Sequence, residues 1–574
     1  MDRLVREAHG TGIDTSAGAL FNHSVWARDR IISAFDLLPE RPEVARQTIL
    51  TLARLQGTRR TVRSEEEPGR IHNELRDLRR WRAPLHLKAP FGLVLAQLWG
   101  GSPRGYITYF GSDSTPLFIS LVAAYAELRP DILDELVVRR DGSAASIGQA
   151  VREAARWIES HLTPDGLVEV PKHNVFSLPP QIWRDSPTSN FDEHGRMANV
   201  VEPMAYLDVQ ALCADALEDA AALFRDGSRQ PSPGPVAERG VRDPGWPEAL
   251  ATEARRIREA TQRTFWMEDE AFYAFAADRD AGGERRVLRA VQSNAGWLLA
   301  TRFFDDLPVA TKQRCVGGVV RTLFSAGMLT PAGVRGRALR HHDPRFRNYH
   351  EDVWPMDTAM IARGLRRHGF HELAHELEAR LVNAATLLGD AWEFIVVDDA
   401  GRVVDPRVRA QEALRLRPDA RGLPSEMTPE ADIAWTATAL LRIKRDRAAR
   451  FLAARVHGSA AARAPDIPDG GLDVAARDRW VVDLTAEVLA QVGTTAAARS
   501  RHDLAAAPVP ISPFYLDHAA GLRHATVVVL AQGFGRVLPL SLVRRIGRDL
   551  RVRAAGGQRR TAGAARRPPA RPRV

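Results

Sequence analysis

Apolar residues recur at helical spacing along most of the chain. Between residues 114 and 128, for example, Leu117, Leu121, Val122 and Tyr125 follow this spacing. The same pattern predicts two helices between residues 26 and 55, with Pro42 separating them. Further helices are predicted over residues 144–162, 203–226, 248–264, 289–303, 308–323, 355–367, 371–388, 430–444 and 475–497, and one short strand-like segment over residues 271–276.

Long polar loops separate these helices, and almost no strand-like segments occur between them. Residues 56–78 and 163–202 form two such loops, and both contain acids, arginines and tryptophan or histidine. A plain four-helix bundle needs short loops at both ends. The pattern therefore favours an all-α fold, a toroid of repeated helix pairs with its loops gathered at one end. Functional residues are usually carried on loops of a rigid scaffold.

The character of the sequence changes after about residue 445, where alanine, arginine and glycine become more frequent. We expect a main domain over residues 1–445, a partly helical extension over 446–520 and an Arg/Ala/Pro-rich tail over 521–574 that is disordered. The net charge of the chain is +9, but residues 551–574 contain eight arginines and no acid, which leaves +1 for the rest. Nucleic acid is therefore not the expected partner, although such a tail has the composition to bind it.

Several classes of protein are excluded or disfavoured by what the chain contains. Its two cysteines, Cys213 and Cys315, belong to no CxxC pair, so a zinc site is not predicted. We expect both to be buried, reduced thiols. The first residues lack the apolar core of a signal peptide, and no run of about 18 uncharged apolar residues occurs. We expect a soluble cytoplasmic protein without metal or cofactor; its oligomeric state stays open.

The candidate chemistry centres on the sequence Trp183-Arg184-Asp185-Ser186. A tryptophan beside a carboxyl group raises the pKa of that group by desolvation, and a general acid needs a raised pKa. Aromatic faces also stack on sugar rings, and acids and arginines bind hydroxyl groups. The alternative is a surface aspartate that caps a turn before Pro187.

Other polar clusters accompany this one at the starts of predicted helices or in loops. Each has a structural alternative: Asp29 as a helix-start acid paired with Arg28, and Asp113 as a helix N-cap. His350 has no partner at metal-ligand spacing, so a metal site is not expected there. The candidate substrate-binding residues are Trp26, Arg28, Asp29, His72, Glu74, Arg76, Asp113, Trp183, Arg184, His350, Trp354 and Asp357.

Seven stretches of this kind follow one another in a fixed order. They cover residues 26–29, 56–57, 68–76, 109–117, 183–186, 292–297 and 349–355. In this order they resemble the amylo-alpha-1,6-glucosidase (glycogen-debranching-type) glycoside hydrolases of the six-hairpin glycosidase superfamily. The resemblance covers roughly residues 20–445 and implies an (α/α)6 toroid that serves as a glycosidase catalytic domain.

The resemblance also implies roles for individual residues. Asp185 would be the general acid, and a late glutamate would activate water in an inverting reaction on an α-linked glucoside. Where relatives have Leu-Pro-Glu, this chain has Leu423-Pro424-Ser425-Glu426, so Glu426 is the expected base and Glu430 the alternative. Residues 350–352 also differ from the smaller loop of relatives. A mannosyl or trehalose-like substrate, or a carbohydrate-binding toroid without catalysis, therefore remain alternatives.

Overall fold

The computed structural model describes residues 2–497, with gaps at 9, 19–20, 82–93, 179, 187–188, 226–244, 281, 343–348, 399–400, 407–428 and 458–473. Within this part of the chain, helices dominate and the strands are short. The tail expected over residues 521–574 lies outside it, as do Glu426 and, within the 446–520 extension, residues 458–473 and 498–520.

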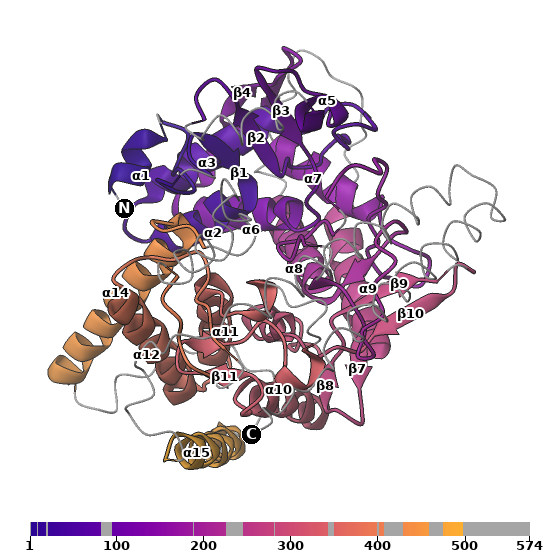
Figure 1. The fold of residues 1–574 in the computed structure, drawn as a ribbon. Helices are drawn as coiled ribbons and strands as arrows, with labels where there is room; N and C mark the ends of the chain where they lie inside the picture. The colour runs from indigo at the N-terminus through magenta and orange to yellow at the C-terminus, as the bar shows by residue number, and fades with distance from the viewer. Residues whose placement is uncertain are drawn as a thin grey trace, which may run out of the picture.

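The inner layer is a closed ring of helical elements (Figure 1). Each packs against the next, and the last returns to contact the first. In chain order they are α2 (Ala27–Leu37), α6 (Ser114–Leu128), α8 (Leu207–Arg225), the 3-10 helix η5 (Ser293–Ala300), α11 (Pro355–Arg367) and α14 (Ala434–His457).

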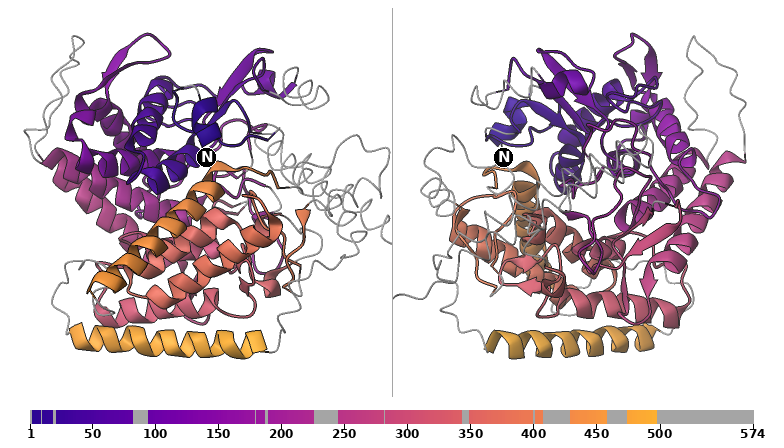
Figure 2. Two further views of the ribbon diagram at one scale, coloured as in Figure 1. Left: turned by 90° about the vertical axis from the view of Figure 1, so that its left-hand side faces the viewer. Right: turned by 45° about the vertical axis from the view of Figure 1, so that its right-hand side comes forward.

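A second layer of helices covers the outside of the ring. Most of them follow their inner partner directly and pack on it, while α15 packs on α12 (Figure 2). The outer helices are α3 (Pro42–Leu55), α7 (Ile147–Glu159), α9 (Trp246–Phe265), α10 (Val309–Leu323), α12 (His371–Leu388) and α15 (Val474–Ala497). The ring of helix pairs confirms the all-α toroid expected from the sequence.

The seam where the ring closes is held by a buried carboxylate. Asp36 on α2 accepts hydrogen bonds from Arg363 of α11 and from Arg442 of α14, each at 2.8 Å. Thr438 of α14 donates a third at 3.3 Å. Since these helices are more than 300 residues apart in sequence from α2, one aspartate ties the two ends of the ring together.

Short antiparallel strands in the loops were not expected, apart from the one near residue 272. A sheet in the order β1-β2-β3 joins β1 (Ser24–Trp26), β2 (Glu74–Asp77) and β3 (Gly105–Thr108), and it pairs Trp26 with Glu74. A second sheet has the order β10-β9-β6, and the remaining strands form hairpins. These strands are β4 (Leu136–Val138), β5 (Ala144–Ser146), β6 (Ala205–Tyr206), β7 (Trp266–Met267), β8 (Phe272–Tyr273), β9 (Ala276–Arg279), β10 (Arg285–Leu288), β11 (Leu329–Thr330) and β12 (Gly333–Val334).

The helix bounds follow the sequence pattern closely, with two differences. The segment expected to be helical over 289–303 is the 3-10 helix η5, in which a Cβ at Gly296 would lie 2.6 Å from Cγ1 of Ile361, so η5 and α11 touch closely. The helix expected over 430–444 begins at Ala434 and continues to His457, so it passes through residue 445. The domain boundary proposed there stays a prediction.

Smaller elements complete the description of the chain. They are α1 (Asp2–Glu7), α5 (Ala96–Leu98), η2 (Pro130–Asp134), η6 (Leu339–His341) and η7 (Tyr349–Glu351). Cys213 on α8 and Cys315 on α10 are both buried free thiols. Over the described ranges, no helix has the length and apolarity needed to cross a membrane.

Candidate active site

Carboxyl groups gather at the ends of the ring helices that face the loops. Asp29 lies in the first turn of α2, Asp208 in the first turn of α8 and Asp357 in the first turn of α11. Asp113 immediately precedes α6. Because a helix N-terminus carries partial positive charge, it favours nearby anions. The fold therefore places acids from distant parts of the sequence at one end of the ring.

Asp185 lies in the loop between α7 and α8, and about a third of its side chain is exposed. Its Oδ1 accepts a hydrogen bond from the Tyr349 hydroxyl at 3.2 Å and lies 3.5 Å from Nε2 of His350. Burial lowers the pKa of His350 to about 4, so this imidazole is neutral near pH 7. Asp185 is thus a carboxyl group that reaches solvent beside a phenol and a neutral imidazole.

Trp183 and Arg184 fix the backbone on which Asp185 sits. The backbone N–H of Trp183 donates to Oδ2 of Asp113, and its indole N–H donates to Oδ2 of Asp208, both at 3.1 Å. Arg184 is buried and donates to the carbonyl of His350 at 2.9 Å, so its charge points into the protein. The indole of Trp183 stacks on that of Trp297, with ring centroids 5.9 Å apart.

Residues 26–29 reach this cluster through Arg28, which also contacts the stretch at residues 72–76. Arg28 pairs with Asp113 at 3.2 Å and donates to Oδ1 of Asn73 at 3.2 Å. Asp29 is buried beside it, and the pKa of Asp29 rises to about 7, chiefly through desolvation. Trp26 is partly exposed, and its indole contacts Phe21 edge to face at 5.2 Å.

Several of the expected binding residues lie beneath the surface of the site. The Arg76 guanidinium lies 4.2 Å from the ring centre of Trp81 and pairs with Glu74 at 2.5 Å. His72 is fully buried, and desolvation lowers its pKa to about 3.

Asp357 is also fully buried, under the tryptophans of the site. It accepts hydrogen bonds from Ser293 at 2.5 Å and from the indole of Trp297 at 2.6 Å. Trp354, whose indole donates to the carbonyl of Tyr349 at 3.1 Å, is buried nearby. These contacts support the walls of the site, and direct contact of His72, Glu74, Arg76, Trp354 or Asp357 with substrate stays a prediction.

The late part of the chain contributes two glutamates that touch each other. Oε2 of Glu430 accepts from the Ser16 hydroxyl at 2.6 Å and from the Phe21 backbone N–H at 3.3 Å. Its own backbone N–H donates to Oε2 of Glu393 at 3.2 Å, while the Glu393 N–H donates to the Glu430 carbonyl at 2.8 Å. Glu430 is therefore in contact with the site, and the other expected base, Glu426, lies outside the described residues.

Glu393 is a further acidic residue of the site that is not predicted from the sequence. Burial raises its pKa well above the ordinary value, and nearby carboxylates add to the rise. Those carboxylates are Glu430, Asp29 and Asp185, which places Glu393 within electrostatic reach of the general-acid candidate. A signal for it exists in the sequence, because Glu393 lies between Trp392 and Phe394 just as Asp185 lies close to Trp183.

Aromatic and acidic side chains thus form two contact groups, which meet at the neighbouring residues Glu393 and Phe394. Phe21 contacts Trp26 and Glu430, Glu430 contacts Glu393, and Tyr349 contacts both Asp185 and Phe394. No group of three or more His, Cys, Asp or Glu side chains in the described residues is arranged to hold a metal ion. The fold and the site together define a helical toroid with an acidic, aromatic-lined site at its loop end.

Comparisons with solved structures return glycosidases. The chain is similar to a GH63 mannosylglycerate hydrolase from Thermus thermophilus in complex with glucose, at 17% identity and a TM-score of 0.47 over 77% of this chain and 98% of that one. It is also similar to a rhamnosidase from Klebsiella oxytoca with rhamnose bound, at 12% identity and a TM-score of 0.40 over 74% and 58%. No protein-family model and no curated protein matches the chain.

Replacing Asp29 with asparagine is expected to stabilise the protein, and more so at higher pH. A carboxyl group whose pKa is raised from 3.8 to about 7 in the folded state contributes stability that is fully present below pH 3.8 and is lost as the pH rises from there through 7. Asparagine removes that loss, so we expect a gain of about 1–3 kcal/mol at pH 8 and almost none at pH 4. Thermal unfolding at both pH values measures the gain.

Asp141 provides a control of opposite sign for this experiment. Hydrogen bonds from Ser143 lower the pKa of the exposed Asp141 carboxyl to about 2. Asp141→Asn should therefore lose stability at pH 8 relative to pH 2, whereas Asp29→Asn should gain stability over the same rise in pH. If the unfolding temperature of Asp29→Asn equals that of the wild type at every pH, the pKa of Asp29 is not raised by desolvation in the folded protein.

Proposed function

We propose that the protein is a glycoside hydrolase that uses two carboxyl groups at the loop end of the toroid. The observation that carries the proposal is the placement of Asp185 and Glu393, two partly exposed carboxyl groups from distant segments, on either side of one aromatic contact: Tyr349 bonds Asp185 and stacks on Phe394, the neighbour of Glu393. Glycosidic cleavage needs one carboxyl group to protonate the leaving oxygen and a second to activate water or attack the sugar.

In this proposal Asp185 is the general acid, as the sequence predicts. Tyr349 and the neutral His350 hold its Oδ1, while its exposed side reaches the leaving oxygen of a bound sugar. The reactive form is the one in which Asp185 carries the proton and the opposite glutamate is ionised.

The opposite glutamate is the group that accepts a proton from the attacking water. Glu393 is our leading candidate because it is partly exposed and lies next to Phe394, which stacks on the same Tyr349 that bonds Asp185; Glu430 and Glu426 are the candidates from the sequence. The reaction is proposed to be inverting, which requires a separation of roughly 6.5–9.5 Å between the two carboxyl groups so that water fits.

The proposed substrate is an α-linked glucoside of the type cleaved by amylo-alpha-1,6-glucosidases, with small mannosyl and trehalose-like α-glycosides as the alternatives. Partly exposed Trp26 and Tyr349 offer aromatic faces for a sugar ring. Within the described residues, Arg28, Arg76 and Arg184 are each paired with a protein carboxylate or carbonyl group.

A substrate panel tests this proposal. Purified protein is incubated with isomaltose, panose, trehalose, mannosylglycerate and maltose, and released sugar is quantified. We expect an α-glucoside to be cleaved, with the anomer of opposite configuration as the first product by nuclear magnetic resonance. If no sugar is released from any member of the panel but calorimetry detects sugar binding, the protein is a non-catalytic carbohydrate-binding toroid instead.

A further inference from the structure

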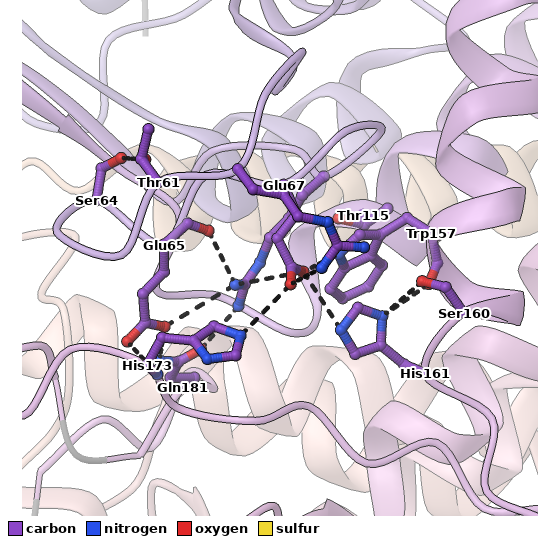
Figure 3. Close-up of polar contacts among 12 residues, drawn as sticks. Thr61, Ser64, Glu65, Glu67, Thr115, Trp157, Ser160, His161, His173 and Gln181 are labelled. Atoms are coloured by element: carbon purple, nitrogen blue, oxygen red, sulfur yellow. Dashed lines mark hydrogen bonds and ion pairs between the residues drawn. The ribbon is translucent and has the colours of Figure 1, made fainter.

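A buried polar network surrounds Gln181, in the stretch that leads to Asp185 (Figure 3). It joins the loop after α3 to the loop after α7. Gln181, four residues before Asp185, is 6% exposed, while Glu65 and Arg70 are completely buried. None of these three is among the residues assigned to the reaction above. Because these side chains are buried, leaving any of their polar groups without a hydrogen bond costs free energy.

The Gln181 amide is held on both of its sides. Its Nε2 donates to Oε2 of Glu65, and its Oε1 accepts from Nη2 of Arg70 at 2.7 Å. Its backbone carbonyl also accepts from the N–H of Ser112 at 2.7 Å, directly before Asp113, which holds the N–H of Trp183. The side chain and the main chain of Gln181 are therefore fixed at once, just before the catalytic segment begins.

Glu65 is the centre of the network. Its Oε1 accepts from the backbone N–H groups of His173 and Asn174 at 3.1 and 2.9 Å and from the Ser177 hydroxyl at 2.9 Å. Its backbone has a φ of 55°, a left-handed conformation that costs free energy for a residue other than glycine. Such a conformation persists where the surroundings fix it, and here three donors and Gln181 do so.

We propose that Gln181, clamped between Glu65 and Arg70, positions residues 181–186 so that Asp185 meets the substrate in a reactive geometry. This inference rests on the proposed function and adds positioning residues to it. The clamp sets where the carboxyl group of Asp185 lies along the loop, while Tyr349 and His350 set how it is oriented. Small displacements of a catalytic group reduce kcat strongly, so the clamp acts on turnover more than on binding.

An exchange of the two side chains tests the clamp. Gln181→Glu places two carboxylates against each other, and Glu65→Gln places two amide donors against each other. Rotating the amide introduced at position 65 does not remove the clash between donors. Its NH2 group would then face the N–H groups of His173 and Asn174 and the Ser177 hydroxyl. In the double variant E65Q/Q181E the new amide donates to the new carboxylate, which still accepts from Arg70. We expect each single variant to lower kcat by about tenfold or more and to change KM by less than about threefold.

The double variant should recover kcat to within about threefold of the wild type, since every hydrogen bond is again made. Gln262→Leu is the matched control, because Gln262 also accepts a hydrogen bond, from Tyr273 at 2.5 Å, but on outer helix α9. It should lower the unfolding temperature and leave kcat unchanged. Wild-type kcat in both single variants, or a double variant no better than the worse single one, would overturn the proposal.

Hydrogen exchange separates a failure of the clamp from a failure of the proposed function. If the wild type cleaves no glycoside, amide exchange over residues 181–186 still reports how firmly the segment is held. We expect each single variant to raise this exchange rate by about tenfold or more, and the double variant to restore it. Unchanged exchange in all three variants would refute the positioning role whatever the activity of the protein.

Discussion

Replacing Asp185 with asparagine is expected to lower kcat for glycoside hydrolysis by about 10²–10⁴-fold, which is the contribution typical of a general acid. Asparagine has the same size, and its carbonyl oxygen can still accept the hydrogen bond from Tyr349. It has no acidic proton to give to the leaving oxygen. The measurement is initial-rate kinetics on the substrate found in the panel. The free energy of unfolding, measured on the same protein, should stay within about 1 kcal/mol of the wild type.

The leaving group of the substrate sharpens this test. An aryl glycoside whose phenol is acidic needs little protonation as it departs, so Asp185→Asn should lose much less activity on it than on a natural disaccharide. Asp165→Asn is the control, because Asp165 lies in the same loop but is half exposed and pairs with Arg285. Equal losses on both substrates, or unchanged turnover on the disaccharide, would remove Asp185 from the role of acid.

The helices of the toroid were predictable because their signals are local. Residues 355–367 and 371–388 were predicted to the residue, since Pro355 begins α11 and Gly369, with a φ of 87°, ends it before α12. Apolar spacing and turn residues decide such bounds without reference to the rest of the chain. The toroid itself followed from the alternation of these helices with long loops.

The contacts that make the site were not predictable, because they join residues that only the ring brings together. Gln181 and Glu65 lie 116 positions apart and Glu393 lies 37 positions from Glu430. The pairing of β1 with β2 likewise depends on tertiary position, since strands of three or four residues have little local signal. Glu393 could not be assigned to the site from the sequence for the same reason. The local sequence shows an acid between two aromatic residues, but only the fold places that acid near Asp185.

Replacing Glu393 with glutamine is expected to lower kcat by about 10²–10⁴-fold as well, because the amide cannot take the proton of the attacking water. The stability of the folded state should not decrease. Burial and three neighbouring carboxylates raise the pKa of Glu393 well above 4.5, so a neutral amide removes an unfavourable charge and the unfolding temperature should stay equal or rise at pH 8. Kinetics and thermal unfolding of the same preparation measure both effects.

Comparison with Glu430→Gln decides between the late glutamates. Glu430 is held by Ser16 and by the N–H of Phe21, so its replacement should lower kcat by less than Glu393→Gln does, about tenfold. Azide adds a positive test, because a small anion that enters the space left in Glu393→Ala can attack the sugar in place of activated water. A glycosyl azide of inverted configuration is then the expected product, with partial recovery of rate. If Glu430→Gln instead abolishes turnover and Glu393→Gln does not, Glu430 is the base; if both retain it, the role passes to Glu426.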